Sequence, residues 1–163
     1  MSPFFIQQLQ FVSDAANKNF LVYLISLFAL LYLYLSAYKK EALFLVIATI
    51  SNLFATFLKF IFRQPRPYSA YNNYFFDQYG FPSGHTLLYT VLFGFLIYLS
   101  FKLTSIPLLI RVLAVIVSFY FISLVGISRV YLGQHYVWDV VGGYVFGLLY
   151  LTGLILFDKK LKI

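Results

Sequence analysis

The sequence predicts an all-α, polytopic integral membrane protein, folded as a helical bundle of about five transmembrane helices, or six. The first observation is composition: of the 163 residues, 62% are hydrophobic and only 10% are charged, whereas soluble domains carry roughly 25% charged residues. The second is a set of charge-poor runs that each approach the ~20 residues needed to cross a bilayer. These five runs are Phe20 to Tyr38, Ala42 to Leu58, Thr86 to Phe101, Val112 to Ser128 and Val140 to Phe157.

Residues 1–19 precede the first run and hold apolar side chains at helical spacing among glutamines: Phe5, Leu9 and Val12. This pattern indicates a short interfacial helix lying on the membrane, with a loosely ordered tail as the alternative. The first run is too long for the apolar part of a typical signal peptide, and two lysines follow it instead of a cleavage site. We therefore expect an uncleaved first span.

Short connections join the five runs, and the longest of them, Arg63 to Pro82, leaves no room for a further soluble module. A single membrane-embedded domain over residues 1–163 is expected. The chain has no cysteine, which excludes thiol nucleophiles, cysteine-bound zinc and disulfides.

Lysines cluster after the first, third and fifth runs: Lys39 and Lys40, then Lys102, then Lys159, Lys160 and Lys162. With five spans these clusters fall on one side of the membrane, and the positive-inside rule assigns that side to the cytoplasm. The prediction is a protein of the plasma or inner membrane with a cytoplasmic C-terminus. This placement explains the net charge of +7, so no nucleic-acid partner is expected.

The stretch from Ser128 to Asp139 places ionisable residues where an apolar chain should carry none. If a helix begins near Tyr136, His135 and Asp139 share one of its faces. The carboxylate would then fix the imidazole tautomer and leave the other nitrogen as a base or nucleophile. Arg129 would hold an anion in front of that nitrogen. The alternative is an intramembrane salt bridge that only ties two helices together.

Two further cations gather toward the same side, at the end of the second run. Lys59 lies near that end and Arg66 follows it. Pro65 and Pro67 stop the helix, so Arg66 is expected to turn back over the site and face the same anion as Lys59. Taken singly, Lys59 could instead snorkel to the interface and Arg66 could bind lipid head groups.

The third run opens with Ser83, Gly84 and His85. Backbone amides at this helix start, the positive end of the helix dipole and the Ser83 hydroxyl would together cradle an anion. Gly84 lets the backbone approach closely, and His85 would stand at the rim. Singly, Ser83 could be a plain N-cap and His85 a satisfied polar residue.

Together these residues predict a phosphoryl-transfer site at the outer membrane face that needs no metal and no cofactor. A transferring phosphoryl group spreads negative charge over three oxygens, so the site must surround it with donors. A two-metal site would need several carboxylates. The chain has five acidic residues, and the other four are not clustered with Asp139 in the sequence: Asp14, Glu41, Asp77 and Asp158.

Three motifs stand in order, each at a predicted helix end: K-x6-RP from Lys59, PSGH from Pro82 and SR-x5-H-x3-D from Ser128. Together they resemble the type-2 phosphatidic acid phosphatase superfamily, which includes lipid phosphate phosphatases, glucose-6-phosphatase and the vanadium haloperoxidases. The motif core, residues 59–139, covers about half of the chain. Gln64 departs from the family, where proline is common, and Arg63 looks like a secondary basic residue. Many bacterial relatives have six spans.

The resemblance implies a helical-bundle core and a phosphohistidine mechanism. In that mechanism His135 is the nucleophile, Asp139 orients it, and His85 serves as acid and base. The resemblance also implies phosphate binding by Lys59, Arg66, Ser83, Gly84 and Arg129.

The expected function is that of a membrane lipid phosphatase acting on a phosphomonoester or diphosphate. Candidate substrates are phosphatidylglycerol phosphate, phosphatidic acid, undecaprenyl diphosphate and a lipid A phosphate, which the sequence does not rank. A lipid phosphotransferase is the alternative, and a non-catalytic transporter or lipid-binding protein is a further one. No feature indicates the oligomeric state. Aromatic residues between the first two motifs favour the head-group region: Tyr68, Tyr71, Tyr74, Phe75, Phe76, Tyr79 and Phe81.

Overall fold

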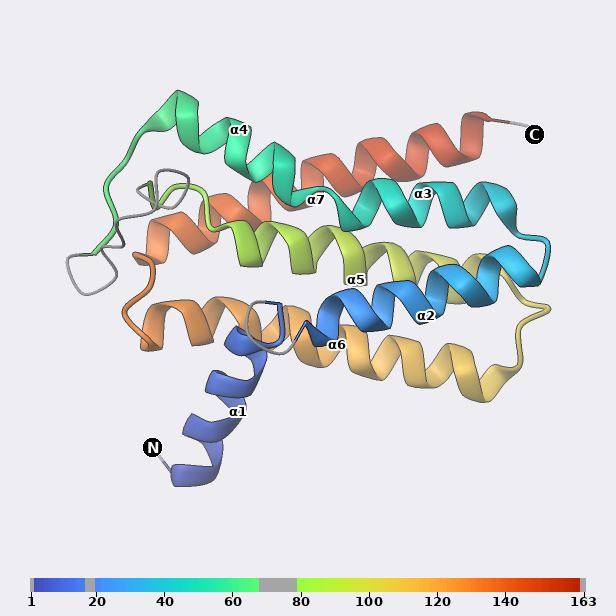
Figure 1. The fold of residues 1–163 in the computed structure, drawn as a ribbon, viewed down its shortest axis with the longest axis horizontal. Coiled ribbons are helices and arrows are strands. Elements are labelled where there is room, and N and C mark those ends of the chain that lie inside the picture. The colour runs from blue at the N-terminus through green and yellow to red at the C-terminus, as the bar shows by residue number, and fades with distance from the viewer. Residues whose placement is uncertain (1, 17–19, 68–78, 162–163) are drawn as a thin grey trace.

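Helices make up most of the chain that the computed structural model describes, which is residues 2–16, 20–67 and 79–161. They are α1 (Pro3–Asp14), α2 (Leu21–Leu35), α3 (Lys39–Thr49), α4 (Asn52–Phe62), α5 (Gly84–Lys102), α6 (Leu108–Tyr131) and α7 (Val137–Lys160). The all-α prediction is confirmed, and the long helices run side by side as a bundle (Figure 1).

Four segments of the described chain are long and apolar enough to cross a membrane: Lys39–Phe62, Gly84–Lys102, Leu108–Tyr131 and Val137–Lys160. The first predicted span is shorter than expected, because α2 has only 15 residues, or about 22 Å of helix. Phe20 and Ala37, which flank it, have φ of 50° and 65°, a left-handed conformation that ends a helix. The described part of the bundle thus has four segments of spanning length and one shorter apolar helix.

The second span is broken between α3 and α4, at Ile50 and Ser51. The Thr49 hydroxyl donates to the Leu45 carbonyl at 2.8 Å and lies 2.5 Å from the Ser26 hydroxyl of α2. Such side-chain bonds compete with the helix ladder and bend helices. Beyond the break, α4 runs at an angle to α3 (Figure 1).

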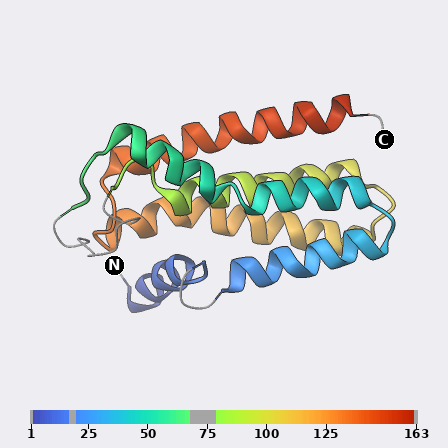
Figure 2. The same ribbon diagram turned by 45° about the horizontal axis from the view of Figure 1, so that its top comes forward.

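Helix α5 lies at the centre of the bundle, between α6 on one side and α3 with α7 on the other (Figure 2). Its side chains are almost continuously buried from Thr86 to Phe93. Glycines allow α7 to approach it closely. A Cβ at Gly143 would lie 2.8 Å from the Ser83 carbonyl, and one at Gly147 would lie 2.9 Å from Thr90 Cβ. The start of α7 is therefore held against the start of α5.

The bundle has two chemically different ends. The α2–α3 and α5–α6 connections and the C-terminus gather at one of them, which we call the far end (Figure 1). The predicted lysine clusters lie in these segments, except Lys162, which is outside the described residues. The end of α4, the start of α5, the end of α6 and the start of α7 meet at the opposite end, which we call the site end.

An ion-pair network closes the far end around Asp158, which is fully buried. Its carboxylate is 2.6 Å from Lys102 Nζ and 3.4 Å from Lys40 Nζ, and Lys102 also pairs with Glu41 at 2.8 Å. Tyr98 donates to the same carboxylate at 2.6 Å. The network joins α3, α5 and α7.

We expect Asp158→Asn to lower the melting temperature in detergent, because two lysines lose a buried partner, at a cost of about 3 kcal/mol. Lys159→Gln is the control, since Lys159 is exposed at the same end. Equal melting temperatures for the two variants would show that the network does not stabilise the bundle.

Candidate active site

His135 and Asp139 form a buried pair where α7 begins. His135 Nδ1 lies 3.2 Å from Asp139 Oδ2, and the two residues are only 3% and 2% exposed. The same carboxylate oxygen accepts from the backbone N–H of Tyr136 at 2.9 Å, as in a capping box. Asp139 thus caps its own helix and orients the imidazole. With Nδ1–H facing the carboxylate, Nε2 of His135 carries the lone pair.

The surroundings of His135 favour the neutral imidazole. Burial lowers the pKa of His135 to about 4, and three neighbouring cations add to this shift although the bond to Asp139 opposes it. The cations are Arg129, Arg66 and Lys59. At neutral pH, Nε2 is therefore unprotonated and able to act as a nucleophile or base.

The turn after α6 brings His135 back over Arg129. Gly133 has φ of 65°, a left-handed value that glycine adopts without strain. The backbone N–H groups of Gln134 and His135 then both donate to the Arg129 carbonyl, at 3.0 and 3.2 Å. This turn fixes the backbone of His135 next to that of Arg129, although the two residues are six positions apart.

Arg129 is fixed by a residue that sequence reasoning missed. Its Nη1 donates to the Ser13 hydroxyl of α1 at 2.7 Å, and both residues are at least 96% buried. Helix α1 is anchored nearby, because Tyr89 of α5 donates to the Val12 carbonyl at 2.8 Å and Tyr120 of α6 donates to Gln8 at 2.5 Å. The N-terminal helix is therefore part of the site.

The turn before α5 is tied to the start of α7. The backbone N–H of Ser83 donates to the Asp139 carbonyl at 2.8 Å. Ser83 stands at the N-cap position, but its hydroxyl does not cap the helix. It accepts from the Thr86 hydroxyl at 2.9 Å, which leaves its own proton to donate elsewhere. Gly84 is enclosed, since a Cβ there would lie 2.7 Å from Asn52 Oδ1.

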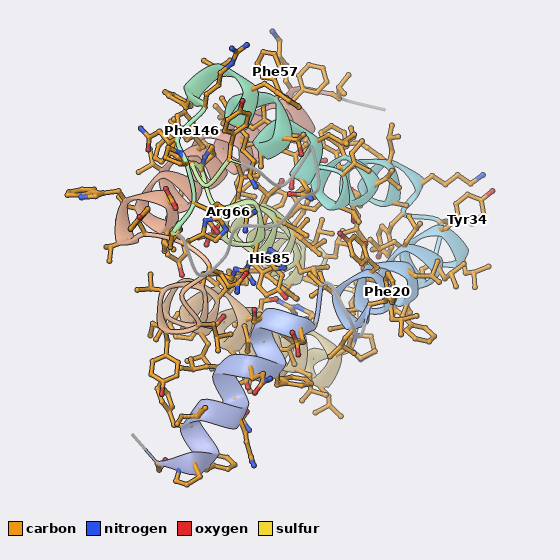
Figure 3. The ribbon with its side chains drawn as sticks, turned by 60° about the vertical axis from the view of Figure 1, so that its left-hand side comes forward. Phe20, Tyr34, Phe57, Arg66, His85 and Phe146 are labelled. Atoms are coloured by element: carbon orange, nitrogen blue, oxygen red, sulfur yellow. The ribbon has the colours of Figure 1, made fainter. Side chains whose placement is uncertain are left out.

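His85 lies in the first turn of α5 and points into the cluster of polar atoms at the site end (Figure 3). Its Nε2 is buried and has no hydrogen-bond partner among the described residues. Buried polar atoms are seldom left in this state. The ring lies one turn from Tyr89, with 6.2 Å between their centroids.

Lys59 and Arg66 reach the same region from α4 and the segment that follows it. Each is 7% exposed, and Arg66 Nε donates to the Tyr79 carbonyl at 3.4 Å. An isolated antiparallel β-bridge between Pro65 and Tyr79 pairs the chain that leaves α4 with the chain that leads to α5. A Cβ at Gly80 would lie 2.9 Å from Asp139 Oδ2, so the returning chain presses against the start of α7.

All eight predicted site residues thus lie at the site end. Seen from that end, Arg66 and His85 lie well inside the bundle, whereas Phe20, Phe57 and Tyr34 lie at its periphery (Figure 3). Arg63 stays apart, because it is exposed and its Nε donates to the Phe60 carbonyl at 3.0 Å.

Of the predicted loop aromatics, Tyr79 and Phe81 are described, and both pack on neighbouring helices. Tyr79 lies against Phe60, and Phe81 against Phe62 and Phe146. Five fall outside the described residues: Tyr68, Tyr71, Tyr74, Phe75 and Phe76.

Comparison with known proteins gives concordant matches. The model of the PAP2 superfamily matches residues 40–163. Phosphatidylglycerophosphatase B of Bacillus subtilis (strain 168) is 39% identical over 94 residues, which is 53% of this chain and 42% of that protein, so the match spans less than half of the relative. The crystal structure of a transmembrane PAP2 type phosphatidylglycerolphosphate phosphatase from Bacillus subtilis aligns with a TM-score of 0.74 and 27% identity, covering 99% of this chain and 80% of that one.

Proposed function

The chain belongs to the PAP2 superfamily, and we propose that it is a membrane phosphatase that removes phosphate from a lipid through a phosphohistidine intermediate. The observation that carries the proposal is the buried His135–Asp139 pair, at 3.2 Å, among the charges of three cations. A structural salt bridge would not need a second histidine with a buried ring nitrogen at the same end of the bundle. His85, with its unsatisfied Nε2, supplies one.

The cage for the phosphoryl group is built from side-chain cations and one helix start. Lys59, Arg66 and Arg129 provide positive charge, and Ser83 with the Gly84 amide provides neutral donors. Such donors stabilise the charge on the transferring group when they are fixed in place beforehand. No metal is needed in this arrangement, because the cations carry the charge that Mg²⁺ supplies elsewhere.

The proposed reaction has two steps at one phosphorus. His135 Nε2 attacks the phosphorus, the bond to the lipid oxygen breaks, and His85 gives that oxygen a proton. Water then attacks the phosphorus of the phosphohistidine, His85 takes a proton from that water, and the bond between phosphorus and His135 Nε2 breaks, which releases phosphate and restores the neutral imidazole. Asp139 stabilises the charge that the His135 ring carries between the steps.

The proposed substrate is phosphatidylglycerol phosphate. The names of the curated relative and of the structural neighbour support it, since both are phosphatases of this lipid. The apolar bundle supports a lipid substrate in general, because the site end of a membrane-spanning bundle lies at the level of the lipid head groups.

The test is phosphate release by the purified protein, in detergent and in bilayers, from a panel of lipid phosphates. We expect phosphatidylglycerol phosphate to be the best substrate, with activity kept in chelator and inhibited by orthovanadate, which mimics the five-coordinate transition state. Transfer of phosphate to an added lipid alcohol would identify a phosphotransferase instead. No phosphate release from any lipid would reject the proposal.

We further propose that the site end faces the outside of the cell membrane and the lysine-rich far end faces the cytoplasm, as the positive-inside rule requires. The chain has no cysteine, so single cysteines can be labelled cleanly. A cysteine replacing the exposed Gln64 should react with an impermeant maleimide in intact cells. A cysteine replacing the exposed Lys160 should react only after permeabilisation. The reverse pattern would overturn this orientation.

Ser13 is expected to position Arg129 for phosphate binding. Ser13→Ala should lower kcat/KM by about tenfold, because a buried donor of a charged group loses its acceptor, and it should weaken vanadate inhibition in parallel. Ser13→Thr keeps a hydroxyl and should retain much of the kcat/KM and of the vanadate inhibition. Ser123→Ala is the control, since that exposed hydroxyl bonds only its own helix, to the Phe119 carbonyl. Equal effects of the two alanine variants would contradict this role.

A further inference from the structure

Arg111 is a cation of the far end that the catalytic site does not use. The predicted fourth span begins after it, at Val112, but α6 starts at Leu108 and carries Arg111 in its first turn. Arg111 is half-buried on the bundle. An arginine within a spanning helix is costly, so its partner needs to be identified.

Two apolar hollows flank Arg111. One, of about 330 Å³, lies between α2, α5 and α6, with Phe28, Leu96 and Ile110 in its lining. The other, of about 200 Å³, lies along α5 and α6, with Leu108, Val112 and Ile116 in its lining. Both hollows share Arg111 and Ser100.

The side chain of Arg111 bridges α6 to α5 between the two hollows. Its Nε donates to the Ser100 carbonyl at 2.5 Å. The guanidinium has five N–H groups, and no acidic side chain of residues 2–16, 20–67 or 79–161 forms a salt bridge with it. The acids of the far end are occupied, because Glu41 and Asp158 pair with Lys102.

We propose that Arg111 and the two hollows bind one diacyl phospholipid with an anionic head group. The phosphate and head group would meet the guanidinium, and one acyl chain would lie in each hollow. The lining residues Phe28, Leu108 and Ile116 are at least 59% exposed on the outer face of the bundle, where acyl chains are the solvent. A basic group set between transmembrane helices at a membrane surface is suited to an anionic head group. This inference does not depend on the proposed catalysis.

The test uses tryptophan quenching by brominated lipids in bilayers. Trp138 is the single tryptophan, so each reporter is built on Trp138→Phe. Phe28→Trp reports on the larger hollow and Leu108→Trp on the smaller one. Leu149→Trp, an exposed position on α7 that lines neither hollow, is the reporter control. The probes are dibrominated phosphatidylserine and dibrominated phosphatidylcholine, mixed into unlabelled phosphatidylcholine; neither is the proposed product.

At both hollow reporters we expect the binding preference for brominated phosphatidylserine over brominated phosphatidylcholine, measured by quenching, to be about fivefold. At Leu149→Trp the two lipids should quench almost equally. Arg111→Gln should abolish the preference, and Lys160→Gln, an exposed lysine of the same end, should keep it. Equal quenching by both lipids at the hollow reporters would overturn the proposal, even if Arg111→Gln did not fold. A preference that survives in Arg111→Gln, or that Lys160→Gln removes equally, would also overturn it, because general surface charge would then explain it.

Discussion

With an aryl phosphate as substrate, the His85→Ala variant should release one burst of phenolate per site and then stall as a phosphoprotein. An aryl oxygen leaves readily without a proton, so His135 can still attack the phosphorus. The second step cannot proceed at a comparable rate, because the attacking water has lost its base. General bases of this kind contribute about 10²–10⁴-fold.

The measurement is rapid-quench phenolate release, together with protein labelling from a radioactive aryl phosphate. The label should be stable in base and labile in acid, as expected of a phosphohistidine. His135→Ala should give neither burst nor label. Steady turnover of aryl phosphate by His85→Ala without labelled protein, or a label that survives in His135→Ala, would show that the two histidines have been assigned the wrong roles.

The meeting of the motifs at one end can be predicted from the sequence because helix order dictates it. Lys59 ends one helical span, His85 begins the next, Arg129 ends the one after, and His135 precedes the last. In a bundle of antiparallel neighbours these positions fall at the same end. The alternating direction of successive helices likewise places the lysine clusters together at the far end.

Contacts between distant parts of the chain could not be predicted in this way. Ser13 and Arg129 are 116 positions apart, and nothing in the motif pattern connects them. One signal was present: Ser13 shares a helix face with Leu9 and Val12, at the spacing of a buried stripe. A hydroxyl on such a stripe must find a buried polar partner.

Local backbone effects account for the remaining differences between the predicted spans and the helices of the structure. The first predicted span is shortened by left-handed residues at Phe20 and Ala37, neither of which is a glycine. The second is broken where Thr49 bonds to the Leu45 carbonyl and contacts Ser26 of another helix. Hydropathy averages over windows and does not register a single hydroxyl, so it predicts the existence of a span better than its length.

Arg129→Lys is expected to lose roughly 10²-fold in kcat although the charge is retained, which is the scale of losing one fixed donor to a transition-state oxygen. A guanidinium offers two parallel N–H bonds to a phosphoryl group, and an ammonium acts as a point charge. A lysine would also reach the Ser13 hydroxyl with a different geometry, so the contact that holds Arg129 at 2.7 Å would not place the new charge correctly.

Arg63→Lys provides the matched control for this loss, because Arg63 is an exposed arginine of the same end that bonds the Phe60 carbonyl of its own helix. It should retain nearly full activity. Vanadate inhibition should weaken in Arg129→Lys in proportion to the loss of kcat, since the mimic and the transition state use the same donors. Full activity in Arg129→Lys, or a loss of kcat with unchanged vanadate inhibition, would mean that Arg129 supports the fold of the site and does not hold the phosphoryl group.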